Sequence, residues 1–139
     1  MRLVRAGLLT AISDGLFSTV LVTFFYGSTP ARLWQGVAST VGASTVWVGL
    51  LMHFGVAFGW SAMFLFVVLR AGWVRRLLAS PYGTIKGAAL YGPFVWLVMS
   101  LVVIPILVGH GPVITYRWWV QLIGHFPFVG LPIVVSIKR

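Results

Sequence analysis

The sequence predicts an all-α membrane protein built as a bundle of four transmembrane helices. Hydrophobic residues make up 60% of the 139 residues and charged residues only 8%, whereas a soluble domain carries about 25% charged residues. The mean hydropathy is +1.02. Four apolar stretches are each long enough to cross a bilayer, which takes roughly 20 residues. They leave so little chain between them that we expect a single domain over residues 1–139.

The expected spans cover residues 4–26, 46–69, 83–108 and 116–137. In lipid, each such stretch satisfies its own backbone hydrogen bonds only as a helix. The first stretch begins like a signal peptide, but it continues to Tyr26 and is too long for the apolar part of a cleaved signal. We therefore expect this stretch to be retained as the first helix.

The connection between the first two spans carries a helix signal of its own. Thr29 supplies an N-cap hydroxyl and Pro30 occupies the first helical position. Apolar residues then recur on one face at helical spacing: Leu33, Trp34, Val37, Ala38 and Val41. This pattern predicts a short helix in the outer membrane interface. Trp34, like Trp118, is expected to anchor the chain at the outer water boundary.

The connection between the second and third spans is amphipathic and basic. An apolar stripe precedes Pro81 and consists of Trp73, Val74, Leu77 and Leu78. It predicts a short amphipathic segment on the inner membrane surface. Four basic residues are expected to bind anionic lipid headgroups there, each contributing ~1 kcal/mol: Arg70, Arg75, Arg76 and Lys86.

The basic residues also predict the topology. Eight of the ten fall on the side that contains both termini: Arg2, Arg5, Arg70, Arg75, Arg76, Lys86, Lys138 and Arg139. Only Arg32 and Arg117 fall on the other side. The positive-inside rule then places both termini in the cytoplasm of a bacterial inner membrane. The net charge of +9 is thereby explained by topology, and we expect no nucleic-acid partner.

Small residues accompany the polar residues along the spans. In the second span, Gly49, His53, Ala57 and Ser61 recur on one face, and Gly55 and Gly59 form a G-x-x-x-G pair beside it. In lipid, small residues allow helix backbones to approach one another closely. We therefore expect the polar groups of these helices to point into the bundle.

Asp14 is the only acidic residue of the chain, and it lies inside the first span. A carboxylate at the centre of a membrane helix costs roughly 2.5–3.5 kcal/mol, so we expect a buried partner. With ~1.5 Å rise per residue, His53 and His125 reach nearly the same depth from the other surface. The expected buried polar layer therefore consists of Asp14, His53, His125, Gln121, Thr10 and Ser18.

Three interpretations of this layer remain open. It is structural, with Asp14 held by a histidine or by the hydroxyls of Thr10 and Ser18. Alternatively it lines a proton or small-solute pathway, as intramembrane ionisable groups do. In the third interpretation His53 or His125 binds haem or a bacteriochlorophyll-type pigment. The walls of that pocket would be Trp60, Trp96 and Tyr91.

The chain shows no motif of a catalytic or metal site. It has no H-E-x-x-H, no G-x-S-x-G and no cysteine. We therefore expect no enzyme activity, no metal site and no required cofactor. A chain of this kind is most simply a small accessory subunit that packs against other membrane-protein subunits, for example those of an energy-transducing complex.

Three short stretches resemble a known family. They are residues 49–58 around His53, residues 87–92, and residues 124–126 around His125. In these stretches the chain resembles the YagU-like family of small bacterial inner-membrane proteins. The resemblance implies a multi-helix inner-membrane protein and implies no particular biochemical activity. The long extramembrane insertions of some relatives are not found in this sequence.

Overall fold

The computed structural model describes residues 1–138, and every regular element in that range is a helix. Four of the helices are long and apolar enough to cross a membrane: Arg2–Phe25, Val46–Arg70, Gly83–Val108 and Tyr116–Lys138. Their ends lie within two residues of the expected spans. The all-α class and the four long apolar helices are thus confirmed. The basic residue expected at position 139 lies outside the described residues.

Three of the long helices contain a π-helical turn, in which the backbone hydrogen bonds skip one residue more than in an α-helix. The first long helix is α1 (Arg2–Val20) followed by the π-turn η1 (Leu21–Phe25). The second is α3 (Val46–Phe66) followed by the 3-10 turn η2 (Val68–Arg70). The third is α5 (Gly83–Val98), the π-turn η3 (Met99–Val103) and α6 (Ile104–Val108). The fourth is α7 (Tyr116–His125), the π-turn η4 (Phe126–Gly130) and α8 (Leu131–Lys138).

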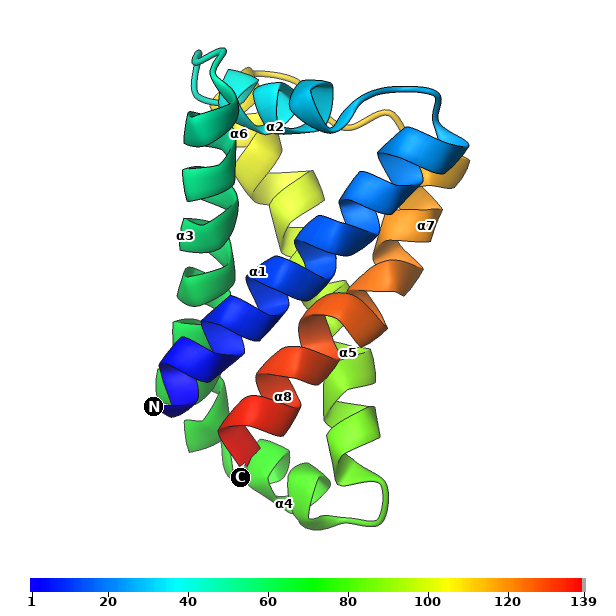
Figure 1. Ribbon diagram of the computed structural model, residues 1–139. Coiled ribbons are helices and arrows are strands. Elements are labelled where there is room, and N and C mark those ends of the chain that lie inside the picture. The colour runs from blue at the N-terminus through cyan, green and yellow to red at the C-terminus, as the bar shows by residue number, and fades with distance from the viewer. Residues whose placement is uncertain (139) are drawn as a thin grey trace.

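Two short helices close the ends of the bundle. In Figure 1, α2 (Pro30–Ser39) lies across the upper end, while α4 (Gly72–Ala79) lies at the lower end beside both termini. Helix α1 packs along α3 and α8, and the fourth long helix packs along α5. The fourth long helix is the most central of the four. In its most apolar stretch of 18 residues 44% of the residues are buried, compared with 17% in the first long helix.

Helices α3 and α5 do not pack along each other, which leaves one side of the described bundle open. They are joined in the half nearer α4, where the Tyr91 hydroxyl donates a hydrogen bond to the Trp60 carbonyl oxygen at 2.7 Å. Phe64 packs on the Tyr91 ring, with centroids 4.7 Å apart. Towards α2 the two helices are separated by a cavity instead.

Glycines set the closest helix approaches. A Cβ atom on Gly92 would overlap the carbonyl group of His125, and one on Gly49 would overlap that of Trp34. These glycines therefore let α5 lie against α7 and let α3 lie against α2. The expected small face of α3 is found, since Gly49, Ala57 and Ser61 are buried.

The G-x-x-x-G pair of α3 is placed differently from expectation. Gly55 and Gly59 are exposed, and a Cβ atom on either would meet nothing within 4 Å. The reason is rotational. These two residues lie about 120–160° around the helix from the buried residues Ala57 and Ser61, at 100° per residue. The pair faces away from the bundle.

A proline in the fourth helix explains how α1 is attached to it. Pro132 has no N–H group to donate to the carbonyl oxygen of Phe128, four residues earlier. The Ser13 hydroxyl of α1 donates to that oxygen instead, at 2.6 Å. Near the α4 end the Arg5 guanidinium donates to the carbonyl oxygen of Ser136 at 2.6 Å. These two bonds hold α1 on the fourth long helix, one at η4 and one at α8.

Helix α2 begins as expected and serves as a lid on the bundle. The Thr29 hydroxyl accepts a hydrogen bond from the Arg32 N–H at 3.3 Å, and Pro30 occupies the first turn. Trp34 and Ala38 are buried under the helix. Val41 lies beyond the end of α2 and is 52% exposed, so it does not extend the apolar face. Trp34 packs inside the protein and is not a boundary anchor.

Helix α4 also packs on the bundle more fully than the sequence suggested. Val74 and Leu78 belong to the main hydrophobic core, while Trp73 is 60% exposed. The apolar stripe of α4 therefore faces partly into the protein interior and partly toward the surroundings.

Trp118 was expected to be an anchor at the membrane boundary. It is buried instead, and its indole nitrogen donates a hydrogen bond to the Ser100 hydroxyl oxygen at 3.2 Å.

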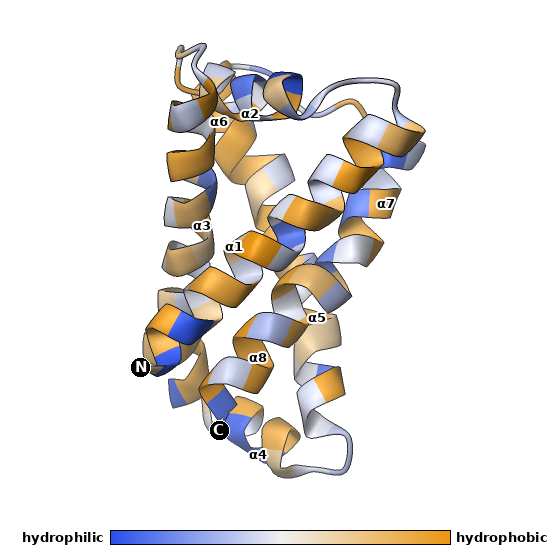
Figure 2. Cartoon of the chain, viewed as in Figure 1, coloured by the Kyte–Doolittle hydropathy of each residue, from blue (hydrophilic) through white to orange (hydrophobic). Residues whose placement is uncertain are grey.

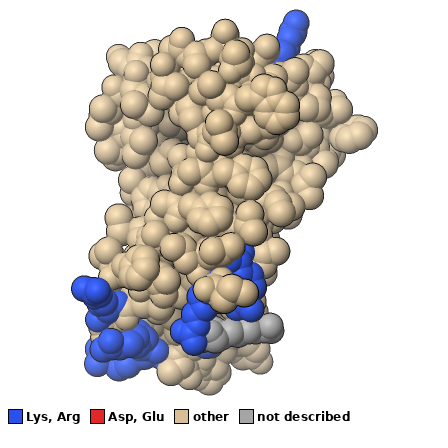
Figure 3. All heavy atoms as spheres, turned by 60° about the vertical axis from the view of Figure 1, so that its left-hand side comes forward, with Lys and Arg blue, Asp and Glu red and all other residues tan. Residues whose placement is uncertain are grey.

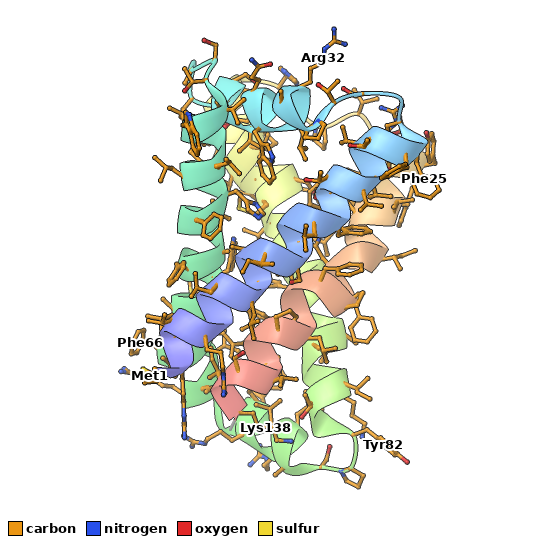
Figure 4. The ribbon with its side chains drawn as sticks, viewed as in Figure 1. Met1, Phe25, Arg32, Phe66, Tyr82 and Lys138 are labelled. Carbon is orange, nitrogen blue, oxygen red and sulfur yellow. The ribbon has the colours of Figure 1, made fainter. Side chains whose placement is uncertain are left out.

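The basic residues are distributed unevenly along the long axis of the molecule. Hydrophobic residues predominate along the long helices in Figure 2, and hydrophilic ones lie near the termini and α4 and also on α2 and α7. On the face drawn in Figure 3, the basic residues cluster at the α4 end and a single one projects at the other end. Figure 4 labels Arg32 at the α2 end, with Lys138 and Tyr82 at the α4 end.

Candidate functional site

A cavity of about 360 Å³ lies between the helices in the half nearer α2. Helices α1, α3 and α7 supply its polar side chains, α5, η3 and α6 supply apolar ones, and α2 covers it. All six residues of the expected polar layer line it: Thr10, Asp14, Ser18, His53, Gln121 and His125. The remaining lining is mostly aliphatic and aromatic. Cavities of this size and composition are typical of small-ligand sites.

Asp14 lies beside His53 in this cavity. The carboxylate oxygen Oδ2 is 3.9 Å from His53 Nδ1, and each side chain is 15% exposed. This separation is too long for a direct hydrogen bond but allows strong electrostatic interaction in a medium of low dielectric constant. The structure thus pairs the only carboxylate of the chain with the histidine of α3.

The backbone of α1 determines which nitrogen of His53 carries a proton. His53 Nε2 lies 2.9 Å from the carbonyl oxygen of Ala11. A carbonyl oxygen can only accept, so Nε2 must donate and carries the hydrogen in the neutral ring. Nδ1 is then the atom that gains or loses a proton. That atom faces Asp14.

Gly15 makes this arrangement possible. A Cβ atom at Gly15 would lie 3.3 Å from His53 Nε2 and 3.5 Å from the ring of Trp34. The missing side chain therefore leaves room for the imidazole to reach the Ala11 carbonyl group. Trp34 packs on that imidazole, with ring centroids 5.1 Å apart. His53 is held between α1 and α2.

His125 is oriented in the same manner but on its own helix. Its Nδ1 lies 2.8 Å from the carbonyl oxygen of Gln121, so that nitrogen donates and Nε2 is left to accept. The Trp96 ring packs on the imidazole with centroids 5.0 Å apart. Gln121 thus joins the layer through its backbone carbonyl group, whereas the sequence suggested its side chain.

The hydroxyls of α1 do not hold Asp14. The Thr10 hydroxyl is buried without a hydrogen-bond partner among the described residues, and so is Asp14 Oδ1. Ser18 lines the cavity one turn further along α1. Of the two histidines considered as partners of Asp14, the structure places His53 within 4 Å of the carboxylate. The Trp96 indole nitrogen is a further buried donor that lacks a partner in the described chain.

The aromatic walls differ in part from expectation. Trp60 and Trp96 line the cavity, but Tyr91 does not. Tyr91 precedes Trp96 by five residues, which places it about 140° around the helix and one turn nearer α4. It lines a second cavity of about 350 Å³ together with Phe64 of α3, Trp73 of α4 and other residues of α4 and α5.

Trp34 was missed as part of the site. It covers the cavity from α2 and contacts His53, although the sequence suggested a place at the membrane boundary. One feature of the sequence could have indicated that α2 packs on the bundle: its apolar face is longer than a simple connection requires. Gly15 was not predicted to be part of the site either, and its position next to Asp14 was the clue to its role.

A pair of axial haem ligands does not fit this geometry. Both ring nitrogens of His53 are directed to protein groups, Nε2 to Ala11 and Nδ1 to Asp14. Only His125 Nε2 remains for an axial bond to a haem or pigment. For metal ions, residues 1–138 contain no group of three or more His, Cys, Asp or Glu side chains that could bind one.

The four basic residues expected to bind lipid headgroups lie at the α4 end, far from the cavity lining. Arg70, Arg75, Arg76 and Lys86 are all exposed. Arg70 ends the second long helix, Arg75 and Arg76 lie on α4, and Lys86 lies in the first turn of α5. None of the four is among the residues that line either cavity.

Comparisons of this chain with protein-family models, with curated proteins and with solved structures gave no match. The resemblance to the YagU-like family therefore stays a prediction from three short stretches of sequence.

Proposed function

We propose that the chain is a multi-pass protein of a bacterial inner membrane with both termini in the cytoplasm. The four long apolar helices support the membrane location. The exposed basic residues near both termini support the orientation, because cytoplasmic loops carry the excess of Lys and Arg. In this orientation the cavity opens in the outer half of the bilayer and α4 lies at the inner surface.

Within this arrangement, the protein provides a proton or small-solute pathway, with the proton as the species that the geometry supports best. One observation carries the proposal: the only carboxylate of the chain lines a cavity at mid-depth, with a titratable imidazole nitrogen 3.9 Å away. Ionisable groups at such depth are costly and commonly mark proton or ion pathways.

The pair of Asp14 and His53 can hold an exchangeable proton without a net charge. With one proton on either of the two groups, the pair is neutral as Asp–COOH with imidazole or as carboxylate with imidazolium. Loss of that proton leaves one negative charge. Only this single change of charge has to be accommodated, and the open cavity admits the water that relays the proton.

The inner end of the pathway is closed by aromatic residues. The Tyr91 hydroxyl bonds the Trp60 carbonyl oxygen between the two cavities. Trp60 lines the cavity that contains Asp14, here called the outer cavity, and Tyr91 lines the second cavity, here called the inner cavity. A proton that reaches Asp14 from outside passes inward when this contact opens, so Trp60 and Tyr91 act as a gate in this proposal.

Proton movement into liposomes tests the pathway. The purified protein is reconstituted with a pH-sensitive dye inside, and a potassium diffusion potential, negative inside, is applied. Wild-type protein is expected to acidify the interior. Asp14→Asn is expected to reduce the rate to that of protein-free liposomes, because the amide cannot bind the proton.

Two histidine variants provide a matched control. His53→Gln removes the imidazole beside Asp14 and is expected to slow acidification. His110→Gln makes the same change in an exposed loop outside the cavity and is expected to leave the rate unchanged. A circular-dichroism melt checks that each variant is folded. Equal rates for wild-type protein and a folded Asp14→Asn variant would contradict the pathway.

A second role, as an accessory subunit of a larger membrane complex, is favoured by one observation. Gly55 and Gly59 lie on an exposed face with open space beside them, the arrangement that allows a foreign helix to approach closely. Native sizing after mild solubilisation tests this role. A species no larger than one 15.3 kDa chain with its detergent would rule it out.

The proposal includes lipid as a partner and assigns no chemical reaction to the chain. Arg70, Arg75, Arg76 and Lys86 at the α4 end would contact anionic headgroups of the inner leaflet. Haem or pigment binding through His125 is the least favoured role. A colourless purified protein would dispose of that role.

A further inference from the structure

We propose that the outer cavity binds a small organic cation, such as an aromatic or quaternary ammonium ion, with Asp14 as its counter-charge and three tryptophans as its walls. The proposal deepens the proposed function, because it names a ligand class for the same cavity and lets that ligand compete with the proton. It depends on the juxtaposition of one unpaired carboxylate oxygen with Trp34, Trp60 and Trp96.

The charge of the cavity favours a cation. Asp14 Oδ1 is buried and has no hydrogen-bond partner among the described residues, so it retains an unused acceptor. No lysine or arginine is among the described residues that line the cavity. An anionic ligand would meet the carboxylate without any compensating positive side chain, whereas a cation would neutralise it.

The walls favour an organic cation over a metal ion. Trp34 comes from α2, Trp60 from α3 and Trp96 from α5, so tryptophans face the cavity from three elements. Cations are attracted to the face of an indole ring, more strongly when water is excluded. Hard metal ions instead require about six oxygen ligands, and this cavity offers a single carboxylate.

Competition with the proton follows from the charge balance. A neutral Asp14–His53 pair releases its one proton when the cation binds, and the site stays neutral with the cation in place of the proton. The only other titratable group that lines the cavity in the described chain is His125 on α7, while the lining residues of α2 and α5 are not titratable in this range. Protonation of His125 adds positive charge and also opposes the cation.

A pair of isosteric probes tests the proposal in the full-length protein. Phenyltrimethylammonium and tert-butylbenzene have nearly the same shape and differ in charge. Binding is measured by equilibrium dialysis of the detergent-solubilised protein, with protein-free micelles as the blank. We expect the cation to bind at one site, about tenfold or more tighter than the neutral isostere.

The pH dependence provides a test that requires no variant. In the pH range where the pair holds its proton, the Kd of phenyltrimethylammonium is expected to rise about tenfold for each unit by which the pH is lowered, because one proton competes for one site. The Kd of tert-butylbenzene is expected to stay constant. A cation affinity that does not change with pH would overturn the proton competition.

Variants then assign the contacts. Asp14→Asn is expected to weaken cation binding about tenfold and to leave the neutral isostere unaffected. Trp60→Leu is expected to weaken it about threefold. Trp47→Leu makes the same change at a residue that is 75% exposed and outside the cavity lining, and we expect no effect.

The outcomes separate this proposal from the proton pathway. Equal affinity for the two probes, or cation binding unchanged in a folded Asp14→Asn variant, overturns the cation site. If Asp14-dependent proton movement persists in that case, the pathway stands without this ligand. If the cation binds as expected but liposomes show no Asp14-dependent acidification, the cavity is a cation site and the proton pathway fails.

Discussion

Gly15→Ala tests whether the missing side chain at this position holds His53 in its observed state. The added Cβ atom would lie 3.3 Å from His53 Nε2 and 3.5 Å from the Trp34 ring. The first distance is too close for relaxed packing, so the imidazole must move by a few tenths of an ångström. The ring is confined by Trp34, and the movement lengthens the 2.9 Å bond to the Ala11 carbonyl oxygen.

Two effects of similar size then oppose each other in the free energy of unfolding. Replacing a helical glycine with alanine stabilises a helix by about 0.8–1.0 kcal/mol. Weakening the His53 hydrogen bond costs about 0.5–1.5 kcal/mol. The net change for Gly15→Ala is therefore expected to be within about 0.7 kcal/mol of zero. Gly55→Ala, whose Cβ meets open space on α3, should gain up to about 1 kcal/mol.

The state of the imidazole separates these effects more clearly than stability does. With ¹⁵N-labelled histidine, NMR chemical shifts distinguish the Nε2–H tautomer from the Nδ1–H tautomer. Wild-type protein is expected to show the Nε2–H tautomer for His53, and Gly15→Ala a mixture of the two. If Gly15→Ala keeps the wild-type shifts and is stabilised as much as Gly55→Ala, the glycine has no role in holding His53.

Three further predictions concern the packing that supports the cavity. Ser13→Ala is expected to lower the free energy of unfolding by about 1–2 kcal/mol, because the Phe128 carbonyl oxygen freed by Pro132 loses its donor; Ser39→Ala on the exposed face of α2 should have little effect in the same denaturant titration. Tyr91→Phe should cost about 1 kcal/mol by removing the bond to Trp60 and should speed proton movement in liposomes, whereas Tyr82→Phe, at a residue 78% exposed, should change neither. Gly49→Leu is expected to lift α2 from α3 and to lower the free energy of unfolding by about 1–3 kcal/mol, measured by thermal unfolding. Gly59→Leu is the control, because its side chain meets open space. An unaltered melting temperature for Gly49→Leu would show that α2 does not pack on α3 at this residue.

The depth of each polar residue could be predicted from the sequence. Because the rise per residue of a helix is nearly constant, the distance of Asp14, His53 and His125 from the ends of their spans follows from counting. The structure places all three in the lining of one cavity. Counting could not decide which histidine meets Asp14, since that depends on which helices are neighbours and how each is rotated.

Rotation explains where the sequence was misleading. Tyr91 was predicted to be a wall of the same pocket as Trp96, but it lines the other cavity. Gly55 and Gly59 have the spacing of a packing motif and yet face outward, because small residues at a four-residue spacing look alike on a buried face and on an exposed one. In a helix that is apolar all around, hydrophobic periodicity does not reveal the inward face.

The sequence by itself determined the class of this protein: four apolar helices of spanning length, their limits, the short helix after Thr29 and the polar residues at mid-depth. These features depend on local composition and on distances along one helix. Only the tertiary structure decided that His53 is the partner of Asp14, that Ala11 sets its tautomer and that Trp34 covers the cavity. Each of those contacts joins residues on different helices, and its geometry comes from the side-chain packing that seats one helix against another.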